Sequence, residues 1–191
     1  MKMGVLEKLF VNSAGHSQSV GRRAEQLVRL ANPQAGQRYL DVGTGNGAAP
    51  IYLARRYGLE ATGVDVDPDQ IALAEQASLG LPNVHFFTQD GTLLPFGDAQ
   101  FDIASAFRVA HHIPNWQAAL SEMVRVLKPA GHFVFADLLV PDCAREFVAR
   151  YGPPSAVINL PSSGRAMFFP KSEGMRKHVD PEKGKRLVYE P

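Results

Sequence analysis

Five short apolar runs alternate with helix-like stretches along residues 36–141, and this alternation constrains the fold more than any other feature of the sequence. The runs are "RYLDV", "EATGVDV", "VHFFTQD", "FDIASAF" and "HFVFADLLV". Continuous apolar character is typical of strands that are buried on both faces of a parallel sheet. The sequence therefore predicts an α/β fold with a doubly wound, mostly parallel sheet, in which the carboxyl ends of the strands share one ligand-binding edge.

The stretches between the runs carry start and stop signals for helices. Asp67 is expected to cap a helix at its N-terminus, and Gln70, three residues later, to complete a capping box. The clearest helical pattern follows Asn115, which is expected to cap it. Lys128 suits the negative end of that helix, and Pro129 is expected to stop it.

Composition limits the classes of function. The 191 residues are 45% hydrophobic and 20% charged, with a net charge of +1, so the chain has no bulk attraction for nucleic acid or an anionic membrane. The single cysteine, Cys143, fits a reducing cytoplasm, and the six histidines lack metal-ligand spacing, so we expect no metal site. No signal peptide is visible, and the resulting expectation is a cytoplasmic protein without membrane insertion.

Three glycines at every second position follow the first apolar run, in the stretch "YLDVGTGNGAAP" at residues 39–50. A glycine turn between a strand and a helix lets a ligand approach bare backbone. A dinucleotide places its pyrophosphate there, and Gly43-x-Gly45-x-x-Ala48 satisfies the looser dinucleotide fingerprint. S-adenosylmethionine lays its methionine portion and ribose across such a turn, so the glycines alone leave both ligand classes open.

Three aspartates help to distinguish the two ligand classes. Asp65 ends the second run, 20 positions after Gly45, where a carboxylate accepts hydrogen bonds from ribose hydroxyls in either class and repels a 2′-phosphate. Asp41 lies two residues before Gly43, at the carboxyl end of the first run, where a negative charge suits an ammonium group rather than a pyrophosphate. Asp90 ends the third run, in a position to accept from an adenine amino group. Asp41 and Asp90 therefore favour S-adenosylmethionine, whereas Asp65 suits either class.

The sequence resembles the class I S-adenosylmethionine-dependent methyltransferases. The resemblance covers about residues 36–140 and is especially close to the small-molecule branch with the ubiquinone/menaquinone methyltransferase-like (type 11) enzymes. Five successive stretches carry it: "LDVGTGNG", "GVDVDP", "TQDGTLLPF", "FDIASAFRVAHHI" and "ALSEMVRVLKPAGHFVFAD". It implies a Rossmann-like fold, S-adenosylmethionine as cofactor with S-adenosylhomocysteine as product, and methyl transfer to a small-molecule acceptor (reaction class EC 2.1.1).

The resemblance also implies roles for individual residues toward the cofactor. Asp41 would lie near the methionine ammonium, Asp65 would bind the ribose, and Asp90 would bind the adenine amino group. The other implied contacts come from the glycine turn and from the ends of the later strands: Gly43 and Gly45 under the methionine portion, Thr44 in the same turn, Val66 against adenine, Gly91 through its backbone, and Phe107 beside the methionine portion.

The chain divides into three parts on this reading. Residues 1–35 are expected to form a helical segment that caps the pocket, and residues 36–141 to form the cofactor-binding α/β core. Residues 142–191 form a short, proline-rich segment of the same domain, in which the family's closing pair of strands is expected to be reduced or altered. The acceptor would be a small molecule and not a nucleic acid, and a homo-oligomer is compatible with the sequence.

No residue pattern names a catalytic group. His111 and His112, after the fourth run, are weak candidates for a general base, and Arg108 for binding an anionic substrate. Two alternatives stay open beside methyl transfer. One is a non-catalytic S-adenosylmethionine-binding protein or truncated methyltransferase, because of the unusual C-terminal segment. The other is an NAD-dependent oxidoreductase, although no tyrosine has a lysine four residues later, as a Tyr-x-x-x-Lys hydride-transfer site requires.

Overall fold

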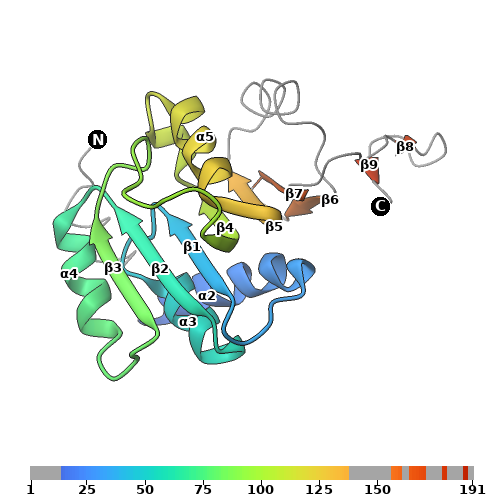
Figure 1. Ribbon diagram of the computed structural model, residues 1–191. Coiled ribbons are helices and arrows are strands. Elements are labelled where there is room, and N and C mark those ends of the chain that lie inside the picture. Colours follow the sequence, from blue (N-terminus) through green and yellow to red (C-terminus); the bar gives the residue numbers. More distant parts are fainter. Residues whose placement is uncertain (1–13, 138–155, 161–163, 171–177, 180–186, 189–191) are drawn as a thin grey trace.

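A twisted sheet runs through the centre of the protein, shown in Figure 1 as a computed structural model that describes residues 14–137, 156–160, 164–170, 178–179 and 187–188. The strand order is β3-β2-β1-β4-β5-β7-β6-β9-β8, and the first five strands in this order are parallel. The predicted parallel α/β fold is therefore confirmed. The five parallel strands are β1 (Arg38–Val42), β2 (Glu60–Asp65), β3 (Val84–Thr88), β4 (Phe101–Phe107) and β5 (Leu127–Asp137).

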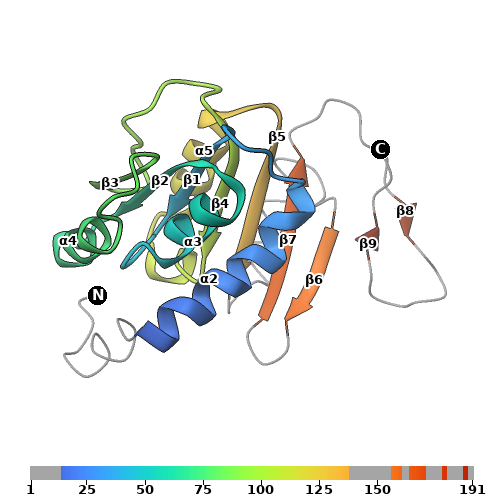
Figure 2. The same cartoon turned by 90° about the horizontal axis from the view of Figure 1, so that it is seen from below.

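Helices cover both faces of this sheet. One buried cluster joins α2, α3 and α4 to alternate strand residues such as Tyr39, and a second joins α5 to the residues between them, such as Leu40. Figures 1 and 2 show α2 and α3 on one side of the sheet and α5 on the other. The helices are α2 (Ala14–Val28), η1 (Arg29–Ala31), α3 (Ala48–Tyr57), α4 (Pro68–Ala77), η2 (Ala110–His112) and α5 (Trp116–Val126).

An antiparallel pair of strands extends the sheet beyond β5. The strand β7 (Gly164–Pro170) pairs antiparallel with β5 from His132↔Pro170 to Asp137↔Arg165, and β6 (Ala156–Leu160) pairs antiparallel with β7. The closing strands are thus five and seven residues long, and only β8 (His178–Val179) and β9 (Leu187–Val188) are minimal. Residues 142–155, the first part of the proline-rich segment, lie outside the described residues.

Local signals for the ends of helices were followed at some positions and overridden at others. The Asp67 side chain accepts a hydrogen bond from the backbone N–H of Asp69, as predicted for an N-cap. The predicted extent of α5 was wrong, because the helix ends at Val126 and Leu127 already pairs with Phe101 of β4. Asn115 precedes α5, but its side chain makes no capping hydrogen bond. In the part of the chain that the structure describes, no helix is long and apolar enough to cross a membrane.

Candidate functional site

Parallel pairing brings the ends of four strands to one edge of the sheet (Figure 1). Asp41 is the last residue but one of β1, and Asp65 is the last residue of β2. Asp90 follows the end of β3, and Phe107 is the last residue of β4. The structure therefore brings the predicted cofactor-binding positions to the same edge, which is where open α/β sheets bind their ligands.

The three glycines of the turn lack side chains for different reasons. A Cβ atom on Gly43 would collide with the side chain of Val109, and one on Gly47 would lie 2.5 Å from the ring of Phe86. A Cβ atom on Gly45 would meet only Oε1 of Gln70, at 3.7 Å, although its φ of +54° still favours glycine. Open backbone for a ligand is therefore found at Gly45, whereas Gly43 and Gly47 make room for the protein's own side chains.

Asp65 connects the glycine turn to the start of α4. Its Oδ2 accepts from the backbone N–H of Gly45 at 2.8 Å, and its Oδ1 accepts from the backbone N–H of Asp67 at 3.0 Å. The side chain is partly exposed, at the end of β2. A carboxylate offers about four lone-pair sites, so two remain for hydroxyl donors such as those of a ribose. The two backbone bonds fix the direction in which these sites point.

Asp41 is a buried carboxyl group, with only 3% of its surface exposed. Its Oδ1 accepts a hydrogen bond from the hydroxyl of Ser105 on β4, at 2.6 Å. Burial raises the pKa of Asp41 to about 6, and the hydroxyls of Ser105, Thr44 and Tyr39 oppose that rise. A carboxylate held in this way gains from a cationic partner, and an ammonium group is such a partner.

Gln70 is a further candidate site residue, which the sequence did not reveal. The capping-box role predicted for it is wrong: its side chain is 1% exposed, and neither Oε1 nor Nε2 has a hydrogen-bond partner in the described residues. It lies beside Gly45, on the first turn of α4. Buried polar atoms without partners cost stability, so a free donor and acceptor beside the open turn fit a polar ligand. A glutamine between buried Ile71 and Asp67 gave no separate signal in the sequence.

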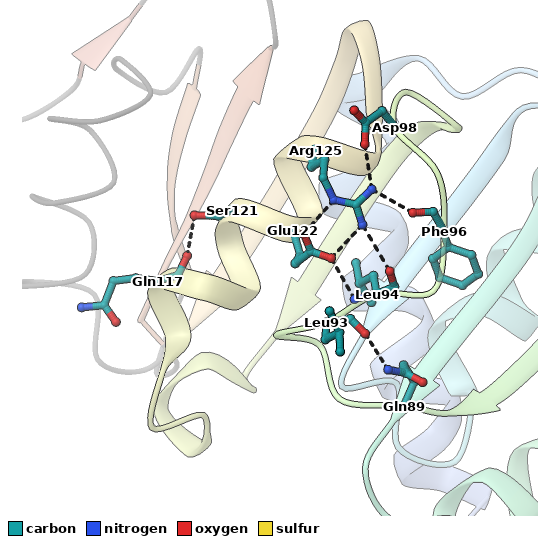
Figure 3. Close-up of polar contacts among 9 residues, drawn as sticks. All are labelled: Gln89, Leu93, Leu94, Phe96, Asp98, Gln117, Ser121, Glu122 and Arg125. Carbon is teal, nitrogen blue, oxygen red and sulfur yellow. Dashed lines mark hydrogen bonds and ion pairs between the residues drawn. The ribbon is translucent and has the colours of Figure 1, made fainter.

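Asp90 closes a turn after β3. Its Oδ1 accepts from both the backbone N–H and the hydroxyl of Thr92, each at 2.8 Å. Its carbonyl accepts from the backbone N–H of Leu93, and Gln89 donates to the carbonyl of Leu93 across the same turn (Figure 3). Asp90 therefore has a turn-forming role, and its role toward adenine remains a prediction.

The segment after Asp90 is clamped to α5 by one arginine (Figure 3). Arg125 donates to the carbonyls of Leu94 and Phe96 and to the carboxylates of Asp98 and Glu122. Glu122 in turn accepts from the backbone N–H of Leu94 at 2.9 Å. The Arg125 guanidinium lowers the pKa of Glu122, while burial opposes that shift. This clamp fixes the connection between β3 and β4 without a helix.

The remaining predicted cofactor contacts differ in exposure. Val66 is 67% exposed, so an apolar face is available next to Asp65. Gly91 is buried, and a Cβ atom there would lie 2.6 Å from Val42. Thr44 is buried in the glycine turn, and Phe107 is half-buried against the cluster that joins α2–α4 to the sheet. Their roles toward the cofactor remain predictions.

The loop after β4 carries the candidate bases. Arg108 adopts a φ of +55°, which is strained for a residue with a side chain, and its backbone N–H donates to the carbonyl of Ala136. His112 is exposed on η2, and its backbone N–H donates to the carbonyl of Val109. The side chain of His111 lies outside the described part, so only its position on η2 is known.

The start of α2 contacts the glycine turn through a hydrogen bond. Nδ2 of Asn46 donates to the hydroxyl of Ser17 at 3.0 Å. A groove of about 790 Å³ opens there between the helices, lined on α2 by Ser17 and Gln18, in the glycine turn by Asn46, and elsewhere by side chains of α3 and α4. None of the predicted cofactor-binding residues lines this groove.

A family model described as "Methyltransferase domain" matches residues 40–135, the segment that contains every strand of the parallel sheet at least in part. The chain belongs to this methyltransferase domain family. It is a class I S-adenosylmethionine-dependent member, as the sequence predicted. The matched family is therefore not that of the NAD-dependent oxidoreductases, the alternative that the glycine turn had left open.

Individual relatives agree with this family. The chain is 38% identical over 115 residues to "O-methyltransferase cnsE" of Penicillium expansum, covering 59% of this chain and 41% of the relative. It is 32% identical over 174 residues to "Fatty-acid O-methyltransferase" of Mycolicibacterium smegmatis, covering 86% of this chain and 60% of the relative. The chain thus spans less than two thirds of the length of each of these two relatives.

Solved structures share the fold. A methyltransferase from Aquifex aeolicus superposes with a TM-score of 0.72 over 87% of this chain and 98% of that one, at 18% identity. The structure titled "Crystal Structure of the [4+2]-Cyclase SpnF" superposes with a TM-score of 0.60 at 31% identity, over 63% of this chain and 45% of that one. The fold of this methyltransferase domain therefore occurs in proteins whose titles name different reactions.

Proposed function

We propose that this methyltransferase domain transfers the methyl group of S-adenosylmethionine to an oxygen atom of a small-molecule acceptor. The observation that carries the proposal is the pair of carboxylates, Asp41 and Asp65, held at the ends of neighbouring strands on either side of open backbone at Gly45. Relatives named O-methyltransferases, from fungi and a mycobacterium, support oxygen as the acceptor atom.

The chain's own residues bind and orient in this reaction. S-adenosylmethionine supplies a methyl group that its sulfonium already makes electrophilic, so no protein nucleophile is needed. Asp41 balances the ammonium charge, Asp65 and Gln70 hold the ribose, and Val66 covers adenine. Positioning an acceptor in line behind the methyl group supplies on the order of 7–11 kcal/mol in favourable cases.

A hydroxyl acceptor must lose its proton during the transfer. His111 and His112 remain the candidates for that base, since η2 directly follows the strand β4 at the ligand-binding edge. We also propose that residues 1–35 cap the pocket, that residues 36–141 form the core, and that residues 142–191 complete the same domain. The contact between Asn46 and Ser17 supports the first of these, because it brings α2 to the turn. A reducing cytoplasm is the proposed location, supported by the single Cys143.

Transfer of a radiolabelled methyl group from S-adenosylmethionine tests this function. The acceptor panel would contain aliphatic alcohols, phenols and fatty acids, with amines and thiols as comparison classes. The expected result is label in an oxygen acceptor, and less of it in the Asp65→Ala variant when the cofactor is below saturation. Label in amines or thiols alone would contradict the choice of oxygen but not the methyl transfer.

A second candidate is binding of S-adenosylmethionine without methyl transfer. The likeness to a protein whose title names a [4+2]-cyclase favours it, because that protein shares the fold at 31% identity. The two candidates differ in one result. Tight binding of S-adenosylhomocysteine, with no label transferred to any acceptor class, would favour the second.

A further inference from the structure

Three polar side chains form a hydrogen-bonded row beneath the glycine turn. Tyr39 and Asp41 point to the same face of β1, and Ser105 of β4 is the direct register partner of Asp41. The Tyr39 hydroxyl lies 2.6 Å from Oγ of Ser105, which lies 2.6 Å from Oδ1 of Asp41. Tyr39 and Ser105 are both 0% exposed, so water does not compete for these bonds.

The direction of the protons in this row follows from the chemistry of the groups. An ionised carboxylate only accepts hydrogen bonds, so the single proton of Ser105 goes to Asp41. The Tyr39 hydroxyl must then donate to Ser105. Burial, reinforced by the charge of Asp41, raises the pKa of Tyr39 well above its ordinary value, so that it stays a neutral donor. Both hydroxyls therefore stabilise the ionised form of Asp41.

The ionisable group that faces Asp41 from the next strand adds no compensating positive charge. Asp65 of β2 is negative and raises the pKa of Asp41, while the hydroxyl of Thr44 in the turn lowers it. In the described residues, Asp41 has no cationic partner. The site thus holds a buried carboxyl group that is supported by hydroxyls and has no cation beside it in the described residues.

We propose that Tyr39 and Ser105 are positioning residues for the cofactor, which hold the Asp41 carboxylate ionised and turned toward the ammonium group of S-adenosylmethionine. This inference rests on the proposed function, in which Asp41 meets that ammonium group. It adds that cofactor affinity depends on pH through Asp41, and that two residues without cofactor contact set this dependence.

The sign of the dependence follows from linkage. An ammonium ligand binds the ionised form of Asp41 and lowers its pKa in the complex. Affinity for the ammonium ligand is therefore highest above about pH 6, the pKa of Asp41 in the free protein. It falls by up to about tenfold for each pH unit below that value. Without the Ser105 hydroxyl the pKa of Asp41 rises, so the midpoint of this change moves to higher pH.

Two ligands separate this role from a general effect on the site. S-adenosylhomocysteine carries the ammonium group, whereas 5′-methylthioadenosine keeps adenine and ribose but lacks the amino acid portion. Both would be titrated calorimetrically between about pH 5 and 8, a range that spans the expected midpoint. The variants are Ser105→Ala, Ser105→Cys, Ser105→Thr and Tyr39→Phe, each checked for its fold by circular dichroism.

The expected results differ between the ligands and the variants. In the wild type, affinity for S-adenosylhomocysteine falls below about pH 6, and affinity for 5′-methylthioadenosine stays flat. Ser105→Ala moves the midpoint to higher pH, and Tyr39→Phe also moves it to higher pH, but by less. Ser105→Thr keeps a hydroxyl and leaves the midpoint at its wild-type value. Ser105→Cys has nearly the shape of serine with a weak donor, so it gives the same shift if the alanine variant does not fold.

Four results would overturn the inference, the first two of which concern the comparison of variants and ligands. One is a midpoint that stays in place in folded Ser105 and Tyr39 variants, and the other is an equal pH response for 5′-methylthioadenosine. Binding of S-adenosylhomocysteine that ignores pH would also overturn it while leaving the proposed function intact. A wild type that binds neither ligand would overturn the proposed function and this inference together.

Discussion

The hydroxyl of Ser105 on β4 donates a hydrogen bond of 2.6 Å to the carboxylate of Asp41 on β1. The two residues are 64 positions apart and lie directly opposite each other in the parallel register. This bond keeps an acidic group inside the protein, where the charged form is costly. The arrangement is understandable if Asp41 serves a cationic ligand, because a structural role alone would be met by a neutral side chain.

Asp41→Asn tests this cost of burial. The pKa of Asp41 rises from 3.8 to about 6 on folding, so ionisation destabilises the fold as pH rises through that window. The variant is therefore expected to be more stable than the wild type at pH 7, by at most about 3 kcal/mol, with no such gain near pH 4. Urea unfolding at the two pH values measures the difference. Equal free energies of unfolding for the variant and the wild type at both pH values would contradict the account.

Gln70→Met tests whether the buried amide serves the ligand. Methionine has a similar length and no strong hydrogen-bonding group, so the variant removes two unsatisfied polar atoms. We expect a gain in the free energy of unfolding of about 1 kcal/mol and a loss of affinity for S-adenosylhomocysteine. Urea unfolding and calorimetric titration measure the two effects. A stabilised variant with unchanged affinity would show that Gln70 does not contact the cofactor.

Arg125→Met tests the clamp between α5 and the segment after Asp90. The variant loses the donors to two backbone carbonyls and two carboxylates, so the free energy of unfolding is expected to fall by about 2–3 kcal/mol. Asp98→Asn is the matched control, because the Asp98 side chain is 79% exposed and its ion pair adds little. Equal urea midpoints for Arg125→Met and Asp98→Asn would argue against the clamp.

Two substitutions distinguish the role of Gly45 from that of Gly47 in the turn. Gly45→Ala meets only one atom, at 3.7 Å, and is expected to cost about 1–2 kcal/mol of stability through its positive φ, while weakening cofactor binding. Gly47→Ala would press against Phe86 and Ala74, at 2.5 and 2.8 Å, and is expected to cost more, about 2–4 kcal/mol. Thermal unfolding and titration distinguish them. Unchanged cofactor affinity in Gly45→Ala would contradict the open-backbone role.

Local patterns in the sequence predicted the parts of the fold that depend on neighbouring residues. The parallel strands and the Asp67 cap follow from apolar runs and from the chemistry of a helix start. The end of α5 could not be predicted this way, because Leu127 leaves the helix to pair with Phe101. Long-range pairing here outweighs the helical pattern of the segment.

The same limit applies to the candidate site. The carboxylates could be located from strand ends alone, since parallel strands share an edge. The packing that requires glycine at positions 43 and 47 could not be predicted, because the side chains involved, Val109 and Phe86, are distant in sequence. The row from Tyr39 to Asp41 likewise depends on Ser105, 66 positions from Tyr39. Tyrosine and serine within apolar runs gave no sign of a shared hydrogen bond.

The affinity of Asp65→Ala for S-adenosylhomocysteine tests the central claim most directly, because Asp65 joins the open turn to the predicted ribose position. Calorimetric titration at pH 7.5 would compare it with the wild type and with Asp69→Asn, which removes an exposed carboxylate from the same helix start. The account predicts a loss of about 1–3 kcal/mol, or about 5- to 150-fold, for Asp65→Ala and none for Asp69→Asn. An unchanged dissociation constant in folded Asp65→Ala would contradict it.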